Sequence, residues 1–132
     1  SKIIHITRNP LDTFISCYSN NFKDNHSYTR NIESYKKVYL EYKKVMNHWK
    51  SIFNDIIEIS YEDLALNFET IIKELLKDLN IGFDTNCLTF YNNNKVAQTP
   101  SIDQVRLPIY NSSINRWMNY KEHLDHIIDL QQ

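Results

Sequence analysis

Two kinds of hydrophobic pattern alternate along the first half of the chain. Lys2 to Thr7 is a short, mostly β-branched run bounded by polar residues, which predicts a strand covered on both faces, as in a parallel sheet. Asp55 to Ser60 has the same pattern and predicts a second strand. Between them, apolar residues recur every three or four positions, which predicts a long helix. The stripe consists of Ile32, Tyr35, Tyr39, Tyr42, Met46 and Trp49. It is too short for a coiled coil of three or four heptads, so we expect these aromatic residues to be core.

The residues after the first strand predict the start of a helix. Asn9 is a good N-cap, Pro10 suits the first turn, and Asp12 stands three residues after the cap. This helix should run to about Asn21. A polar connection from Lys23 to Ser27 should then lead to the long helix.

After the second strand we expect a helix from about Phe68 to Leu79, which Gly82 ends. The remaining helical segments expected are Asp84 to Phe90, Asn111 to Met118 and a terminal helix from about Lys121. Strands separated by helices predict a helix-rich α/β fold with a right-handed crossover. Two strands leave two unpaired edges, so we expect partner strands elsewhere, most naturally upstream of Ser1.

Composition narrows the classes of function. With 132 residues, 42% hydrophobic and 23% charged, the chain has the size and balance of one globular domain. Its net charge of −1 provides no basic field for nucleic acid or anionic lipid, so any anion site must be local. The apolar runs fall far short of the roughly 20 residues of a membrane span. The single glycine, Gly82, excludes a glycine-rich phosphate loop built from these residues.

Cysteine and histidine usage argues against a metal centre. Cys17 and Cys87 are far apart and lack CxxC spacing, which favours buried thiols in a reducing, cytoplasmic compartment over a zinc site or disulfide framework. His123 and His126 are three apart on an expected helix, without a third ligand. We therefore expect no metal.

Three segments could bind an anion or a nucleotide. Arg8 ends the first strand and Ser16 follows inside the next helix, whose N-terminus has free N–H groups and a positive dipole end, so together they could hold a phosphate. The alternative is a surface arginine beside a well-capped helix. Ligands of open α/β sheets bind at this carboxyl edge.

The second segment is Tyr61-Glu62-Asp63-Leu64, at the end of the second strand. Tyr61 could face a nucleotide base or reach a phosphate. Glu62 and Asp63 are more typical of helix-capping residues than of catalytic acids. The third segment runs from Thr99 to Tyr110 and continues to Arg116-Trp117; between its prolines it could line an anionic ligand or pack back on the core.

In this order and at these separations, the segments resemble the sulfotransferase superfamily, in particular the branch with tetratricopeptide-repeat-fused bacterial enzymes and tyrosylprotein sulfotransferases. The resemblance implies that the chain is the C-terminal part of one sulfotransferase domain with a P-loop-kinase-like parallel sheet. It also implies a co-substrate, 3'-phosphoadenosine 5'-phosphosulfate, and no metal. The residues implied in binding this nucleotide are Arg8, Ser16, Tyr61, Ser101, Gln104, Val105, Arg106 and Arg116.

The sequence also departs from the family pattern. Asn20 stands where tyrosylprotein sulfotransferases carry a further arginine. The glycine-bearing 5'-phosphosulfate loop and the base that deprotonates the acceptor have no counterpart, so catalytic residues stay unassigned and we expect these 132 residues alone to be inactive. The acceptor is not identified, and a tyrosylprotein-type enzyme would work in the Golgi lumen. Two alternatives remain: a non-catalytic helical interaction module that uses the aromatic stripe, and a fragment of a nucleotide-kinase-like phosphotransferase.

Overall fold

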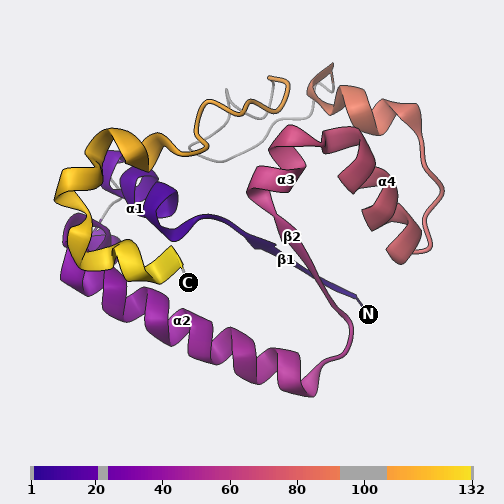
Figure 1. The fold of residues 1–132 in the computed structure, drawn as a ribbon. Helices are drawn as coiled ribbons and strands as arrows, with labels where there is room; N and C mark the ends of the chain where they lie inside the picture. The colour runs from indigo at the N-terminus through magenta and orange to yellow at the C-terminus, as the bar shows by residue number, and fades with distance from the viewer. Residues whose placement is uncertain (1, 21–23, 93–106, 132) are drawn as a thin grey trace.

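The computed structural model describes residues 2–20, 24–92 and 107–131, which form a helix-rich α/β structure around a small sheet (Figure 1). The sheet holds β1 (Ile3–Thr7) and β2 (Ile56–Ser60), which run parallel in a register that pairs Ile3 with Ile56 and Thr7 with Ser60. Since the strands are parallel, the carboxyl ends of both strands lie at the same end of the sheet. The two predicted strands are confirmed within one residue.

Helix α1 (Pro10–Ser19) follows β1 directly, and its cap is the predicted one. The side-chain oxygen of Asn9 accepts hydrogen bonds from the N–H groups of Leu11 and Asp12, and Pro10 is the first helical residue. The connection after α1 differs from the expected polar loop, because residues Asp24–Arg30 form the 3-10 segment η1.

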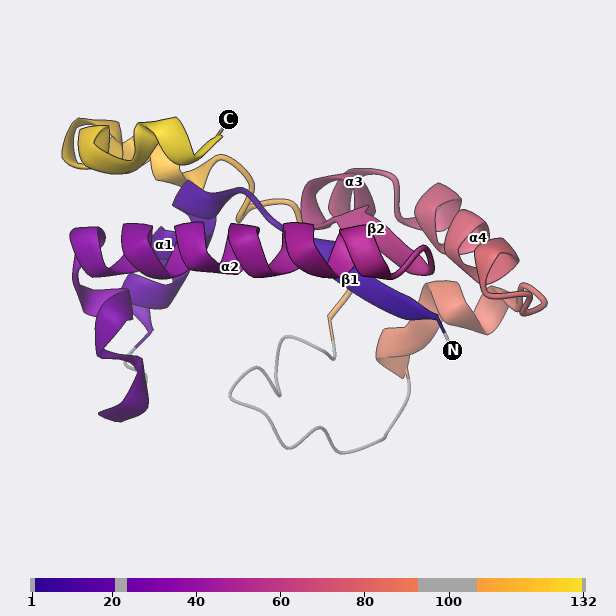
Figure 2. The same ribbon diagram turned by 90° about the horizontal axis from the view of Figure 1, so that it is seen from below.

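Helix α2 (Ile32–Ile52) runs across one face of the sheet (Figure 2). Its Tyr42 hydroxyl donates to Nε2 of His5 at 2.6 Å, and Nδ1 of His5 donates to Glu58 at 3.0 Å. Lys50 near the end of α2 pairs with the other oxygen of Glu58 at 2.6 Å. Neighbouring side chains of β1 and β2 are thereby joined to the helix that connects the two strands.

After β2 come the short helix α3 (Tyr61–Leu66), the helix α4 (Phe68–Asp78) and the 3-10 segment η2 (Thr85–Asn92). The C-terminal region holds two more 3-10 segments, η4 (Arg116–His123) and η5 (Asp125–Gln131). The expected helices from Asn111 to Met118 and from about Lys121 are therefore displaced and tighter than predicted. None of the helices described is both long and apolar enough to cross a lipid bilayer.

The end of α4 corrects one prediction. The residue with the left-handed conformation is Asn80 (φ 56°), whereas Gly82 does not have a positive φ. The N–H groups of Asn80 and Ile81 bond back to the carbonyls of Lys77 and Leu76, which is the Schellman arrangement. Asparagine tolerates this region because its short polar side chain can bond locally, so no glycine is required.

The hydrophobic core lies between α1, α2, η4 and η5, and not around the sheet. Its buried members are Leu11, Phe14, Ile15, Tyr35, Trp117, Leu124, Ile127 and Leu130. Only the first half of the aromatic stripe contributes, with Tyr35 4% exposed while Trp49 is 43% exposed. The expectation that the whole stripe is core is therefore wrong, because α2 extends beyond the elements that pack on its first turns.

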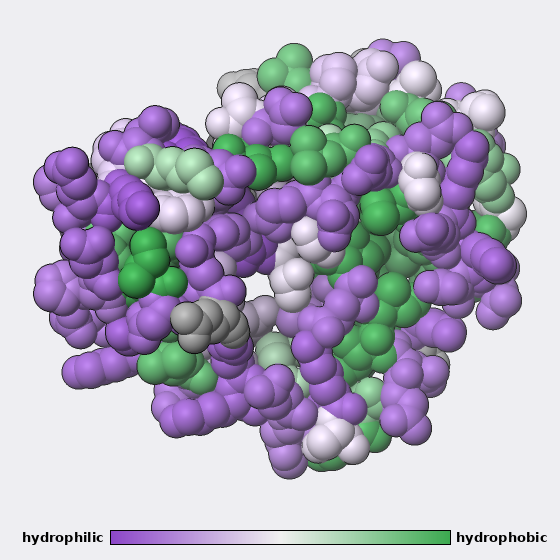
Figure 3. All heavy atoms as spheres, viewed as in Figure 1, coloured by the Kyte–Doolittle hydropathy of each residue, from purple (hydrophilic) through white to green (hydrophobic). Residues whose placement is uncertain are grey.

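The strands are also less covered than predicted. Ile4 and Ile6 of β1 are 44% and 57% exposed, although Ile59 of β2 is buried. In Figure 3, hydrophobic side chains gather over the half of the molecule that holds the sheet, α3 and α4. Among the described residues the sheet has two strands, so both of its edges lack a strand partner.

Candidate functional site

The candidate site lies at the edge where both strands end. Arg8 follows β1 and Tyr61 follows β2, and the parallel register brings these two positions together. The Arg8 guanidinium carbon stands 4.8 Å from the centre of the Tyr61 ring, within the range of a cation–π contact. Two motifs that are about fifty residues apart in the sequence thus share one location.

The segment from Tyr110 to Trp117 crosses the same location. Nη2 of Arg8 donates to the carbonyl of Ser113 at 3.2 Å, and the Tyr61 hydroxyl donates to the carbonyl of Tyr110 at 3.3 Å. The side chains that end the two strands therefore bind the backbone of a segment about a hundred residues beyond Arg8. The sequence offered no sign of these two carbonyl partners.

Asp12 makes the strongest contact with this segment. Its side chain is 2% exposed, and its two oxygens accept the N–H groups of Asn115 and Trp117, both at 2.8 Å. The carboxylate lies in the first turn of α1, where the helix dipole favours a negative charge. We predicted only that Asp12 stands near a helix start, because no spacing rule relates residue 12 to residues 115 and 117.

Glu62 was predicted to cap the helix that follows, but it instead accepts hydrogen bonds from the ends of the two strands. Its two oxygens accept the N–H of Asn9 at 2.8 Å and the hydroxyl of Ser60 at 3.1 Å, so it ties the start of α1 to the start of α3. The N-cap of α3 is Ser60, whose Oγ accepts the N–H of Asp63. Glu62 thus links the two strand ends on which Arg8 and Tyr61 stand.

The charge of Arg8 is not neutralised by a carboxylate within residues 2–20, 24–92 and 107–131. Its Nε is buried and has no hydrogen-bond partner among those residues. Burial raises the pKa of Tyr61 while Arg8 opposes this shift, so the phenol stays protonated at neutral pH. Burial likewise raises the pKa of Cys17, and Arg8 opposes that shift too. The guanidinium charge therefore also acts on the turn of α1 that holds Cys17.

The helix N-terminus contributes less than predicted. We expected free N–H groups there, but Asn9 accepts those of Leu11 and Asp12 with its side chain and that of Thr13 with its carbonyl. Pro10 has no N–H to give. An anion at this edge would therefore rely on side chains, and on Arg8 first of all.

The other predicted site residues are placed as follows. Ser16 lies on α1 one turn beyond Asp12, on the same helix face, and is half-buried. Arg116 is exposed and stands between the two residues whose N–H groups bind Asp12. Four predicted residues lie outside the described parts of the chain: Ser101, Gln104, Val105 and Arg106.

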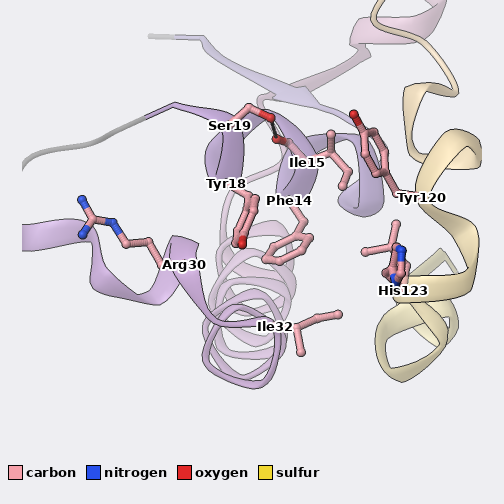
Figure 4. Close-up of a pocket in the computed structure, with 9 residues that line it drawn as sticks. Phe14, Ile15, Tyr18, Ser19, Arg30, Ile32, Tyr120 and His123 are labelled. Carbon is pink, nitrogen blue, oxygen red and sulfur yellow. Dashed lines mark hydrogen bonds between the residues drawn. The ribbon is translucent and has the colours of Figure 1, made fainter.

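A pocket of about 490 Å³ opens beside the C-terminal half of α1, away from Arg8. In Figure 4, Phe14 and Tyr18 from α1 lie across from Tyr120 and His123 from η4, and Arg30 stands apart at the rim. The lining is mostly apolar and aromatic, and the hydroxyl of Ser19 is bonded to the carbonyl of Ile15. Sequence reasoning did not find this pocket.

Metal ligation finds no support in the described segments, which hold no cluster of three or more side chains able to bind an ion. His126 instead approaches Glu33 at 4.0 Å, and both side chains are well exposed.

Comparison with known proteins adds to this geometry. The model of the sulfotransferase family matches residues 1–85, which include both strands and the positions of Arg8, Ser16 and Tyr61. An uncharacterized protein of Aquifex aeolicus is 31% identical over 149 aligned positions, which cover all of this chain and 18% of that protein. The chain thus spans about a fifth of the length of this relative. Because the family match extends over well over half of its residues, the chain belongs to the sulfotransferase family.

Proposed function

We propose that this chain holds the 3'-phosphoadenosine end of 3'-phosphoadenosine 5'-phosphosulfate in a sulfotransferase. The observation that carries the proposal is the setting of Arg8. Its guanidinium stands at the shared end of both strands, against the Tyr61 ring, with no carboxylate partner in the described residues. Such a cation is suited to a phosphate, since a charge-assisted bond forms without first breaking an ion pair.

The residues present fit such a nucleotide. The partnerless, buried Nε of Arg8 is a donor that lacks an acceptor among the described residues. Tyr61 would offer its aromatic ring beside Arg8, since its hydroxyl already donates to the carbonyl of Tyr110, and Ser16 would add a neutral hydroxyl to the 3'-phosphate. Arg116 would contribute a second cation from the opposite segment. The proposed set also keeps Ser101, Gln104, Val105 and Arg106, as the resemblance implies.

The nucleotide, when bound, supplies the sulfuryl group for in-line transfer to a hydroxyl or amine. Arg8, Ser16 and Arg116 would fix its 3'-phosphate, so that the sulfuryl group stands in one orientation towards the acceptor. Restricting that orientation converts an encounter of two molecules into an effectively intramolecular step. The share of this chain is therefore positioning, and charge stabilisation at the sulfuryl group would fall to other residues.

Further parts of the proposal rest on the sequence. A glycine-bearing loop for the 5'-phosphosulfate and a base for the acceptor would be supplied by residues outside these 132, which contain one glycine. The enzyme would fall in the tetratricopeptide-fused or tyrosylprotein-like branch. Both cysteines are unpaired, which supports a reducing, cytoplasmic compartment.

The test is calorimetry of nucleotide binding to the longest natural polypeptide that contains residues 1–132. Arg8→Ala should weaken binding of 3'-phosphoadenosine 5'-phosphate by about 1.5–3 kcal/mol, the range for a hydrogen bond to a charged group. Arg30→Ala is the matched control, since it removes the same charge from η1, and it should leave the affinity unchanged. Equal affinities of wild type and Arg8→Ala would show that Arg8 does not bind the nucleotide. ATP is titrated as well, because ATP binding in preference to the 3'-phosphorylated nucleotide would favour the kinase-like alternative.

The interaction-module alternative now depends on the part of α2, including the end of the predicted stripe, that the core leaves exposed. Val38, Val45 and Ile52 of α2 are 43%, 52% and 52% exposed, and Trp49 of the stripe is 43% exposed, so this face of the helix could meet a partner. Light scattering distinguishes the two functions. A stable assembly through α2, with no effect of nucleotide on the melting temperature, would favour the module.

A further inference from the structure

Four hydrogen bonds hold the segment from Tyr110 to Trp117 against the ends of the two strands and the first turn of α1. Two come from the candidate site itself, through Arg8 and Tyr61, at 3.2 and 3.3 Å. The other two are shorter, at 2.8 Å, and both end on the carboxylate of Asp12. Asp12 is therefore the principal anchor of this segment.

The two anchored amides flank Arg116. Asn115 has the left-handed conformation, with φ 59° and ψ 18°, and the 3-10 segment η4 starts at the next residue. The chain thus bends sharply between the two hydrogen bonds to Asp12. Because the backbone on both sides of Arg116 is fixed, the base of its exposed side chain is fixed as well.

The charge of Asp12 does not oppose an anion at Arg8 through direct pairing. Both oxygens accept backbone N–H groups. The carboxylate also lies in the first turn of α1, at the positive end of the helix dipole. No ion pair joins Asp12 to an arginine anywhere in the described segments. Asp12 can therefore hold the segment while both arginines stay available to a ligand.

We propose that Asp12 is a positioning residue, which fixes Asn115 and Trp117 on α1 and so directs Arg116 to the 3'-phosphate of the nucleotide. This inference rests on the proposed function, because it requires a 3'-phosphorylated ligand. Asp12 itself does not touch the ligand. Its effect passes through Arg116 alone.

The test compares two ligands that differ only at the 3' position, 3'-phosphoadenosine 5'-phosphate and adenosine 5'-phosphate, on the longest natural polypeptide that contains the chain. In Asp12→Asn, one of the two amides loses its acceptor. We expect affinity for the 3'-phosphorylated ligand to fall about tenfold, as for the loss of one charge-assisted contact, with no change for adenosine 5'-phosphate. A merely structural defect would weaken both ligands equally.

A double-mutant cycle with Arg116→Ala tests whether Asp12 affects binding through Arg116. Asp12→Asn should have no further effect once Arg116 is absent, because the two changes remove the same contact. Asp78→Asn, the same change at an exposed position of α4, is the control and should bind like wild type. Where Asp12→Asn is not folded at the assay temperature, Asp12→Glu, which keeps the charge but displaces the carboxylate, is judged by the same criteria.

The outcomes separate the two proposals. If wild type does not prefer the 3'-phosphorylated ligand, the proposed function fails and this inference fails with it. If wild type prefers that ligand, but the Asp12 variant keeps the preference or adds its loss to that of Arg116→Ala, only the positioning role of Asp12 is overturned.

Discussion

At the scale of single residues, Glu58 shows how one carboxylate can join a sheet to its covering helix. It accepts from His5 on the neighbouring strand and pairs with Lys50 on α2. The hydrogen bond from Lys50, followed by that from His5, lowers the pKa of Glu58 even though burial opposes the shift. A lowered pKa in the folded state means that the ionised form stabilises the fold. This stabilisation is complete above the ordinary glutamate pKa and is lost as the pH falls through the lower, folded value.

We therefore predict that Glu58→Gln reduces the pH dependence of unfolding on the acid side. Urea unfolding of wild type should lose stability between about pH 6 and about pH 3, and the variant should lose less over this range. Because the side chain is 43% exposed, the difference should be about 0–1 kcal/mol and should shrink in high salt. Glu74→Gln, an exposed glutamate of α4, is the control. Identical pH profiles for wild type and Glu58→Gln would contradict the assignment.

The same scale shows what the sequence could reveal about the site. Arg8 and Tyr61 were recognisable because each closes a strand, and parallel strands end at one edge. Asp12 was visible only as part of a helix start. Its partners are the backbone amides of Asn115 and Trp117, and every residue except proline carries such an amide. A residue of almost any type can supply a backbone N–H group, so the sequence does not show which residues bind Asp12.

At the scale of elements, the residues at which helices start were predicted better than the residues that stop them and than the extent to which neighbouring elements cover them. Asn9 with Pro10 is a local signal, and the structure confirms the start of α1. The predicted bounds of α4, Phe68 to Leu79, agree with the structure within one residue, but the helix stop was assigned to Gly82, whereas Asn80 has the left-handed conformation. The exposed half of α2 was missed for another reason. Periodicity shows that a face is apolar, and it does not show how far the neighbouring elements extend.

The end of α4 permits a direct comparison of two neighbouring alanine substitutions. Asn80→Ala should destabilise the protein by about 1 kcal/mol, because alanine is less favourable in the left-handed region and lacks the local bonds of asparagine. Gly82→Ala should stabilise it by about 0.4–1 kcal/mol, since a Cβ there meets nothing within 4 Å and φ is not positive. Urea midpoints measure both. The reverse result, a stabilised Asn80→Ala and a destabilised Gly82→Ala, would place the helix stop at Gly82.

At the scale of the whole molecule, the core is distributed unevenly. Five residues of α1 are buried, whereas no residue of α3 or α4 is fully buried. Helices without buried side chains gain little from packing, and helix propensity alone is marginal at such lengths. The molecule therefore has a packed part around α1 and a weakly packed part after β2.

Native-state hydrogen exchange should reveal this division. Amides in the middle of α4 should exchange faster than those in the middle of α1, because local opening of α4 exposes less apolar surface. The comparison requires only wild-type protein, with peptides from η2 as a second region of low protection. Equal protection of α1 and α4 would show that the molecule opens as one unit and would contradict the division.

The parallel pairing of the strands has a consequence for synthesis in the cell. His5 and Glu58, which face each other in the sheet, are 53 positions apart. At about 5–20 residues per second, the ribosome needs about 3–11 seconds to produce the second strand after the first. Throughout that interval the backbone N–H and C=O groups of β1 that bond to β2 in the finished protein lack these partners, and unpaired strand edges are prone to aggregate. Newly made copies should accordingly depend on chaperones more than the small size of the sheet suggests.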